Sequence, residues 1–268
     1  MDRNRSIDIM GIVNLTDDSY YSNSRCRDVK DVLDLVAAHV SGGASIIDVG
    51  ACSSRPGSVP VGAQEEWKRL KPALEAVRAD FPDVRISVDT YWSEVVARVF
   101  DLIGDFIVND ISSGEDDPAM LGVVGNLGLS YVAMHKRGDS LTMSGLTDYA
   151  DVTGDVIRYF ESFSAKAESV GIRDWVIDPG FGFAKTLDQN YELLRNLDRF
   201  RESFGNRRIL VGVSRKSMIY KYLGISPEES LPATQVLHLA ALSRGADILR
   251  VHDSAEASRT VSLYRQLG

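Results

Sequence analysis

The chain has 268 residues, of which 44% are hydrophobic and 25% are charged, as in an ordinary globular protein. Its formal net charge of -8 argues against a nucleic-acid partner, which would require a basic surface. Its two cysteines, Cys26 and Cys52, are too few for a disulfide framework, and no apolar run reaches the roughly 18 residues that cross a membrane. We therefore expect a cytoplasmic protein without a membrane partner.

Short apolar segments rich in β-branched residues recur along the chain and predict eight β-strands. Their almost continuous apolar character, without strict alternation, is typical of parallel strands that are covered on both faces. The predicted strands cover residues 7–16, 44–50, 85–90, 106–110, 130–135, 174–179, 209–214 and 248–253.

Segments with helical periodicity separate these strands. The first begins at Val29, places Val32, Val36 and Val40 on one face, and stops at Gly42. The alternation of strands and helices predicts an α/β fold, a (β/α)8 TIM barrel that forms a single domain over residues 1–268. A doubly wound open sheet shares this alternation, but its first turn is usually glycine-rich, whereas the first strand here ends in NLTDDS. The other predicted helices cover residues 65–81, 91–103, 117–127, 149–170, 188–204, 231–244 and 254–267.

Polar residues stand at the carboxyl end of every predicted strand. In a (β/α)8 barrel these ends converge on one mouth, where active sites are built. A single Asp or Asn at such a position is explained by capping of the next helix. The full set indicates a polar site instead, because buried carboxylates need donors and a ligand rich in N–H groups would supply them. The residues are Asn14, Asp48, Asp89, Asn109, Asp110, His135, Asp178, Ser214, Arg215, Lys216, Arg250, His252 and Asp253.

The sequence around these positions resembles the dihydropteroate synthase family of pterin-binding enzymes along nearly the whole chain. DPGFGFAK followed by SRKS and RVHD is a specific combination, and the blocks appear in the family's order. The resemblance implies condensation of 6-hydroxymethyl-7,8-dihydropterin diphosphate with p-aminobenzoate, which gives 7,8-dihydropteroate and pyrophosphate in folate biosynthesis. The matching blocks are GIVNLTDDS (11–19), IIDVGACSSRPGS (46–58), ISVDTY (86–91), NDISSG (109–114), MHKRG (134–138), DPGFGFAKTLDQNYELLRNL (178–197), VGVSRKSMI (211–219) and RVHDS (250–254).

The resemblance also implies which residues bind the pterin. Asp178 would accept the paired N–H groups of the aminopyrimidinone edge, a two-point bond suited to an ionised carboxylate. Asp89 and Asn109 would meet the remaining edge, and Lys216 would reach the pterin oxygen and a ring nitrogen. Arg250 would lie on the face of the ring and also donate to phosphate. The resemblance also implies a supporting role for Asp48, which would orient the neighbouring groups.

Other residues match the family's catalytic and diphosphate-binding positions. Ser54, Arg55 and His252 would meet the diphosphate, and Mg²⁺ would bind through Asn14 with few other protein oxygens. In the family's dissociative mechanism pyrophosphate leaves first and a cationic pterin methylene forms. Asp18 would stabilise this cation electrostatically.

The p-aminobenzoate end of the site is implied in the same way. Phe183 and the loop at Pro56 resemble the clamp on the aromatic ring, and Ser217, at the start of a helix, would hold the carboxylate. Sulfonamides, which mimic p-aminobenzoate, should therefore compete here. The family resemblance also implies a homodimer formed through the late helices.

Several positions depart from the family's pattern or invite another interpretation. Asp17 replaces a proline, Cys52 replaces a glutamate and Ser54 replaces a threonine, which leaves the rate and the loop conformation open. We interpret Cys52 as structural or incidental, and we expect His39 and His238 to have surface or packing roles. Lys136 and Arg137 replace less charged residues and are open to a solvated role, while Lys185 is assigned either to phosphate contact or to a solvated loop.

Three other functions stay open from the sequence. A methyltetrahydrofolate-binding methyltransferase shares the barrel and the Asp/Asn pterin cradle, but it would need neither the SSRPG loop nor the SRKS block. A catalytically silent paralogue would bind pterin without turnover. A Schiff-base aldolase would use Lys216 as its nucleophile, although the SRKS context favours a charged donor.

Overall fold

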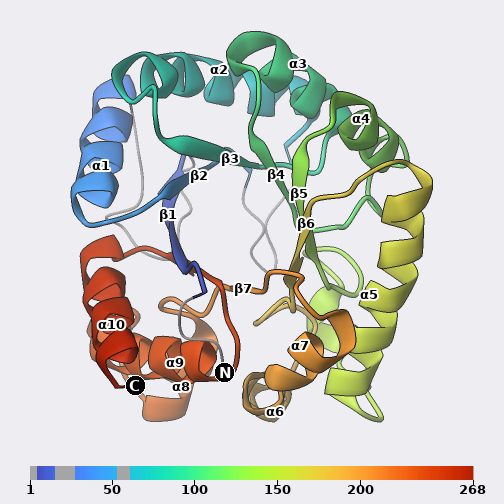
Figure 1. Ribbon diagram of the computed structural model, residues 1–268, viewed down its shortest axis with the longest axis vertical. Helices are drawn as coiled ribbons and strands as arrows, with labels where there is room; N and C mark the ends of the chain where they lie inside the picture. Colours follow the sequence, from blue (N-terminus) through green and yellow to red (C-terminus); the bar gives the residue numbers. More distant parts are fainter. Residues whose placement is uncertain (1–4, 16–27, 53–60, 268) are drawn as a thin grey trace.

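The computed structural model describes residues 5–15, 28–52 and 61–267, which form a barrel of eight parallel strands surrounded by helices (Figure 1). The strands follow the order β6-β5-β4-β3-β2-β1-β8-β7, and a single bridge between Ile177 and Ile209 connects β6 to β7. The barrel is therefore almost closed, as the sequence predicts. The strands are β1 (Asp8–Asn14), β2 (Ile46–Gly50), β3 (Arg85–Asp89), β4 (Ile107–Asp110), β5 (Ser130–Met134), β6 (Trp175–Asp178), β7 (Leu210–Val211) and β8 (Ile248–Val251).

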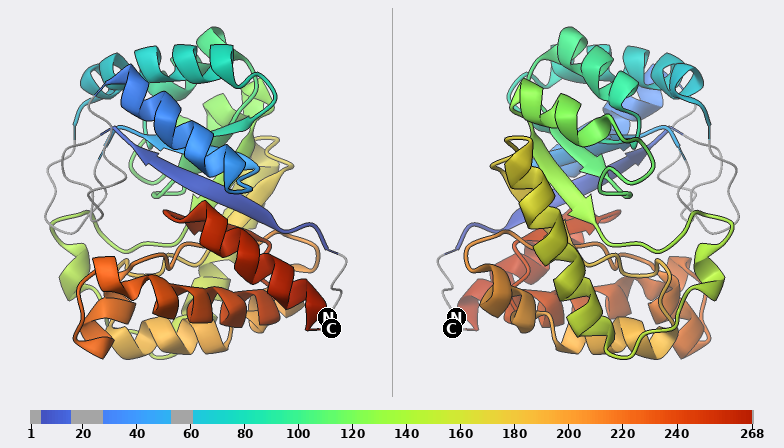
Figure 2. Two further views of the ribbon diagram at one scale, coloured as in Figure 1. Left: turned by 90° about the vertical axis from the view of Figure 1, so that its left-hand side faces the viewer. Right: turned by 90° about the vertical axis from the view of Figure 1, so that its right-hand side faces the viewer.

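The helices cover the outside of the barrel, and Figure 2 shows α1 and α10 on either side of β1. The predicted helix over 188–204 is wrong in one respect, because the chain leaves helical geometry at Asn196 and forms two helices, α6 and α7. The helices are α1 (Val29–Ser41), α2 (Ala63–Asp80), α3 (Ser93–Ile103), α4 (Met120–Leu127), α5 (Val152–Ser169), α6 (Leu187–Arg195), α7 (Asp198–Phe204), α8 (Ser217–Leu223), α9 (Leu231–Ser243) and α10 (Ser254–Gln266), with short 3-10 turns at Met143–Gly145 and Glu228–Ser230.

Strand β7 is much shorter than its apolar sequence predicts. Only Leu210 and Val211 pair with β8, although the apolar run extends over 209–214. The chain then turns at Arg215, whose φ of 52° is rare for a residue with a side chain. This early turn directs Lys216 and α8 away from the ladder.

Alternation along the strands divides the apolar side chains into two layers. The larger layer lies between the strands and the helices, and it includes Ile9, Val13 and Ile47. The smaller layer fills the inside of the barrel, with one side chain from each of six strands and the partly buried Ile107 from a seventh. Its fully packed members are Met10, Ile46, Val132, Val176, Leu210 and Ile248.

In the described part of the chain, no helix is both long enough and apolar enough to cross a membrane. A cytoplasmic location stays a prediction.

Candidate active site

The candidate site lies at the carboxyl ends of the strands, one layer above the apolar side chains that fill the inside of the barrel. Residues two positions apart on a strand point to the same face, so an inward-facing apolar residue is followed by a second inward-facing residue nearer the mouth. In this chain the second residue is polar on four strands. The pairs are Ile46 and Asp48, Ile107 and Asn109, Val176 and Asp178, and Ile248 and Arg250. The strand register therefore brings four of these predicted residues to one level of the barrel.

Arg250 connects two carboxylates across the mouth. Its Nε donates to Asp48 Oδ2 over 2.7 Å, and its Nη2 donates to Asp89 Oδ2 over 2.9 Å. Asp48 also accepts from Ser87 Oγ (2.5 Å) and Asn109 Nδ2 (3.1 Å) and is completely buried. Asp48 thus orients its neighbours, which agrees with the supporting role implied by the sequence.

Among the described residues, few protein donors reach Asp89 and Asp178. Arg250 supplies the ion pair of Asp89, and the backbone N–H of Gly180 donates to Asp178 Oδ1 over 2.8 Å. Burial raises the pKa of both carboxyls above the usual range, although Arg250 opposes the shift at Asp89 and Lys216 opposes it at Asp178. A ligand that offers N–H donors would satisfy both groups.

Lys216 lies over the turn that follows β6. Its Nζ donates to the carbonyl of Phe181 over 2.5 Å and lies 5.0 Å from the centroid of the Phe183 ring. Burial lowers the pKa of Lys216 to about 8, although Asp178 raises it in part. The ammonium group and the aromatic ring thus lie together, and Ser217 begins the seven-residue helix α8 directly after Lys216.

Lys185 fixes the other side of the same turn. Its Nζ contacts His135 Nδ1 at 3.0 Å and donates to the carbonyls of Gly180 (2.9 Å) and Phe183 (3.1 Å). A Cβ at Gly180 would lie 1.9 Å from the carbonyl oxygen of His135, so the turn requires glycine there. Lys185 is buried, and the solvated alternative for this residue is wrong.

Arg215 and His252, which follow β7 and β8, have different surroundings. Arg215 turns away from the mouth, makes a two-point ion pair with Asp253 (2.8 and 2.9 Å), and donates to backbone carbonyls before α9. His252 stays at the mouth, with Nδ1 3.1 Å from Ser214 Oγ. Burial, with Arg250 and Arg215 nearby, lowers the pKa of His252 to about 3, so its imidazole is neutral at pH 7.

Some predicted site residues lie outside the described part of the chain. These are Asp18, Ser54 and Arg55, together with the departures at Asp17 and the clamp at Pro56. Asn14, the predicted metal ligand, is described and is the last residue of β1. Among the described residues no cluster of three or more His, Cys, Asp or Glu side chains is spaced to hold a metal. Any Mg²⁺ here would rely on few protein oxygens plus phosphate and water, which is how Mg²⁺ usually binds.

Glu66 is a buried residue near the mouth that the sequence interpretation missed. It is completely buried on α2, and in the described structure neither carboxylate oxygen has a hydrogen-bond partner of normal geometry. Burial raises its pKa to about 7, and the nearby Asp89 adds to the shift, while Thr90 and Arg69 offset it in part. A signal existed, because Glu66 precedes Leu70, Leu74 and Val77 at helical spacing on the buried face.

Three further residues singled out in the sequence have defined surroundings in the structure. The Cys52 thiol lies 3.4 Å from Tyr91 Oη and burial raises its pKa, which supports the structural or incidental interpretation. A solvated Lys136 is wrong, since its buried Nζ contacts both oxygens of Asp116 at 2.8 and 2.9 Å. Arg137 is half-buried and stacks 3.6 Å from the ring centroid of Tyr149.

The two histidines on helices are packing residues, which is one of the two roles that the sequence predicts. His39 is buried between Ser254 Oγ (2.7 Å) and the carbonyl of Ile12 (3.1 Å). His238 is also buried, with Nδ1 3.2 Å from Gln235 Oε1. Neither lies on the surface.

Comparisons with known proteins agree with this geometry. A family model described as "Pterin binding enzyme" matches residues 10–252. The dihydropteroate synthase of Escherichia coli K12 is 40% identical over 258 residues, which are 94% of this chain and 90% of that protein. The solved Yersinia pestis dihydropteroate synthase in complex with a sulfonamide drug has a TM-score of 0.91 and 32% identity, covering 100% of this chain and 95% of that one. The Xanthomonas albilineans dihydropteroate synthase with 4-aminobenzoic acid has a TM-score of 0.88 and 33% identity, covering 99% and 94%.

Proposed function

The chain belongs to the pterin-binding enzyme family and, within it, to the dihydropteroate synthases, and from this premise we propose how its residues share the work of the reaction. The reaction condenses a dihydropterin hydroxymethyl diphosphate with p-aminobenzoate to give dihydropteroate and pyrophosphate. The observation that carries the proposal is the meeting of five polar side chains from five different strands or strand ends at one mouth. They are Asp89, Asn109, Asp178, Lys216 and Arg250.

In this proposal the carboxylates and cations recognise opposite features of the pterin. Asp178 accepts the two N–H donors of the aminopyrimidinone edge, while Asp89 and Asn109 contact the rest of that edge. Lys216 donates to the pterin carbonyl oxygen and a ring nitrogen, and Arg250 covers the face of the heterocycle. The raised pKa values of Asp89 and Asp178 support this assignment, because a ligand with N–H groups would favour their ionised forms.

The proposal divides the remaining residues between the diphosphate and the amine. His252 contacts the diphosphate together with Ser54 and Arg55. Asn14 would hold a Mg²⁺, which would supply positive charge beside the leaving group. Phe183 contacts the ring of p-aminobenzoate, beside the ammonium group of Lys216, and Ser217 binds its carboxylate.

The chemical step exchanges one bond at the exocyclic methylene. The C–O bond to the diphosphate breaks, and its electron pair leaves with pyrophosphate. Asp18 stabilises the cationic methylene that remains. The amine nitrogen of p-aminobenzoate then forms the new C–N bond and releases its proton to solvent or pyrophosphate.

A pyrophosphate-release assay with Mg²⁺ tests this function. We expect dihydropteroate to form only when the pterin diphosphate and p-aminobenzoate are both present, and we expect sulfonamides to compete with p-aminobenzoate. Pterin binding without pyrophosphate release would contradict the catalytic role and indicate the silent paralogue. Methyl transfer to a corrinoid would indicate the methyltransferase, and noncompetitive sulfonamide inhibition would contradict the Phe183/Ser217 placement.

A homodimer through the late helices is the final part of the proposal. Large apolar side chains are exposed on α8, α9 and α10, where Tyr222 is 66%, Val236 is 66% and Leu263 is 65% exposed. Exposed apolar side chains that form one contiguous patch often mark an interaction surface. Light scattering should give twice the chain mass, and Val236→Glu should shift the mass toward one chain. A monomeric wild-type protein would contradict the dimer.

A further inference from the structure

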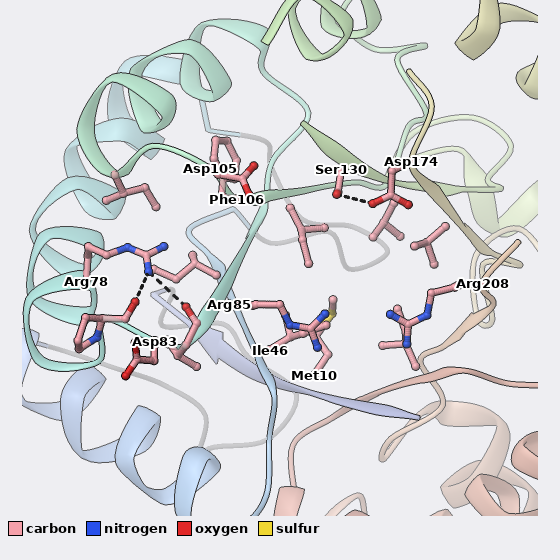
Figure 3. A pocket seen from close by; sticks show the side chains of 18 residues that line it. Met10, Ile46, Arg78, Asp83, Arg85, Asp105, Phe106, Ser130, Asp174 and Arg208 are labelled. Carbon is pink, nitrogen blue, oxygen red and sulfur yellow. Dashed lines mark hydrogen bonds between the residues drawn. The ribbon is translucent and has the colours of Figure 1, made fainter. Parts of the chain in front are cut away.

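A second cavity lies at the opposite end of the barrel from the candidate active site. It has a volume of about 530 Å³ and is lined by residues at the amino ends of the strands (Figure 3). Arg85 begins β3 and Asp89 ends it, so the cavity and the mouth are about 13 Å apart along that strand at roughly 3.3 Å per residue. This volume lies within the range of small-molecule sites, roughly 300–1,000 Å³.

The floor of the cavity is the apolar layer inside the barrel. Met10, Ile46, Val132, Val176 and Ile248 all line it, and each is buried. These side chains come from five different strands and offer no hydrogen-bonding group. The floor therefore favours an apolar ligand body.

Two arginines extend over this floor from opposite sides. In Figure 3 the guanidinium groups of Arg85 and Arg208 point toward the middle of the cavity, near Met10 and Ile46. Asp8 holds both of them, since it accepts from Arg85 Nη2 over 2.5 Å and contacts Arg208 Nη1 at 2.7 Å.

The contacts of these arginines leave donors available. Each guanidinium has five N–H groups. Among the described residues, Arg85 uses Nη2 on Asp8, while Arg208 uses Nη1 on Asp8 and Nη2 on the carbonyl of Asp247. At Asp8 two positive charges meet one negative charge, while Arg78, Asp83, Asp105 and Asp174 stand elsewhere around the lining. A guanidinium fork fits a carboxylate in a two-point bond.

The opposite rim limits the charge of the ligand. Asp105 and Asp174 stand there, and Asp174 already accepts from Ser130 Oγ over 2.5 Å. Their carboxylates would repel the second negative charge of a phosphate monoester. We propose that the base of the barrel is a second small-molecule site, which binds a monocarboxylate with an apolar body between Arg85 and Arg208.

The full chain and 3-phenylpropionate as probe test this site by calorimetry in the presence of saturating dihydropteroate, which occupies the substrate site. We expect the probe to bind with dihydropteroate present, and to bind at least tenfold more tightly than neutral 3-phenylpropanol or cationic phenethylamine. Arg85→Gln combined with Arg208→Gln should weaken binding at least tenfold. The control Arg98→Gln removes an arginine outside the cavity that pairs with Glu94, and it should leave binding unchanged.

A second variant tests the site without removing the two arginines, so its result does not depend on whether the double arginine variant folds. Ser130→Phe adds bulk at the rim without changing charge, and it should block the probe while synthase activity stays at the wild-type level. No binding to the wild-type protein, equal affinity in the arginine variant, or displacement of the probe by dihydropteroate would each overturn the proposal. None of these outcomes affects the pyrophosphate-release assay, so the two functions are tested separately.

Discussion

Aspartates at the two ends of the barrel have pKa shifts of opposite sign. At the base, Asp8 accepts from Ser45, Arg85 and Arg208, and these donors lower its pKa although burial alone would raise it. At the mouth, burial raises the pKa of Asp89 and Asp178 despite the nearby cations. Three donors outweigh burial at Asp8, whereas at Asp89 and Asp178 the loss of solvent on burial outweighs the few groups that favour the ionised form.

This contrast separates stability from binding. A carboxylate whose donors come from the protein stabilises the fold, since its ionised form is favoured once the chain has folded. A buried carboxylate with too few donors costs folding free energy until a ligand completes its hydrogen bonds. The base therefore holds the barrel together, and the mouth keeps its polar groups available for substrate.

The largest effect should come from Glu66, the buried carboxylate near the mouth with a pKa of about 7. Its unfolded pKa is near 4.3, so the folded state binds the proton more tightly and stability falls as pH rises between these values. The unfolding free energy of Glu66→Gln minus that of the wild type should therefore rise by about 2.5 kcal/mol from pH 5 to pH 8. Urea denaturation across this range measures it.

The exposed neighbour Glu65 provides the control for that experiment. Glu65→Gln should follow the wild-type pH dependence, because Glu65 lies on the solvent side of α2 and pairs with Arg69. If the unfolding free energies of wild type and Glu66→Gln changed in parallel with pH, the Glu66 carboxylate would have hydrogen-bond partners in solution and this prediction would be wrong.

The next effect concerns binding at the mouth. Asp178→Asn replaces a charged acceptor by a group that is half donor, and it should weaken pterin binding by about 2 kcal/mol, or roughly thirtyfold. Calorimetry with the pterin measures this directly. At the base, Asp247→Asn should lower stability through Arg201 and the N–H of Ile209 but leave pterin affinity unchanged. Unchanged affinity in Asp178→Asn would contradict its assignment.

A smaller effect should follow from breaking the ion pairs of Asp8. Because Arg85 and Arg208 are partly exposed, Asp8→Asn should cost only about 1–2 kcal/mol of stability at pH 7. The pKa of Asp8 is lowered in the folded state, so its contribution is present above the unfolded value of about 3.9 and is lost as pH falls below it. Chemical denaturation checks this, with exposed Asp83→Asn as the control. A variant as stable as wild type would contradict a stabilising base.

The sequence predicts the barrel and the mouth well because both depend on local patterns. Period-two strands place Asp48 and Arg250 two residues after Ile46 and Ile248, so their meeting follows from the register once a barrel is assumed. The short β7 and the break at Asn196 have no such signal, since the first depends on the turn at Arg215 and the second on packing of the helix end.

Long-range partners explain the other misses. The sequence does not separate phosphate contact from solvent exposure for Lys185, because nothing local links it to His135, which lies 50 residues earlier. The cavity at the base has no local signal for the same reason, since Asp8 on β1 brings together Arg85 of β3 and Arg208, which precedes β7. Periodicity predicts which face a residue occupies, and it does not predict which charges share that face.

Lys185 gives the smallest expected effect. It is a buried cation at the mouth, and its hydrogen bonds in the described structure go to protein groups. It donates to the carbonyls of Gly180 and Phe183, so Lys185→Met should loosen the turn that carries the Phe183 ring. We expect the KM for p-aminobenzoate to rise several-fold, about 1 kcal/mol, with a smaller change in the KM for the pterin diphosphate. Burial lowers the pKa of Lys185 to about 7, so the wild-type side chain is increasingly neutral above that pH, and its hydrogen bonds to the two carbonyls lose their charge. The difference between wild type and variant should therefore shrink from pH 6 to pH 8.5. Lys221→Met on the exposed side of α8 is the control, and equal rises in both KM values at every pH would show a general loss of structure and not a positioned ring.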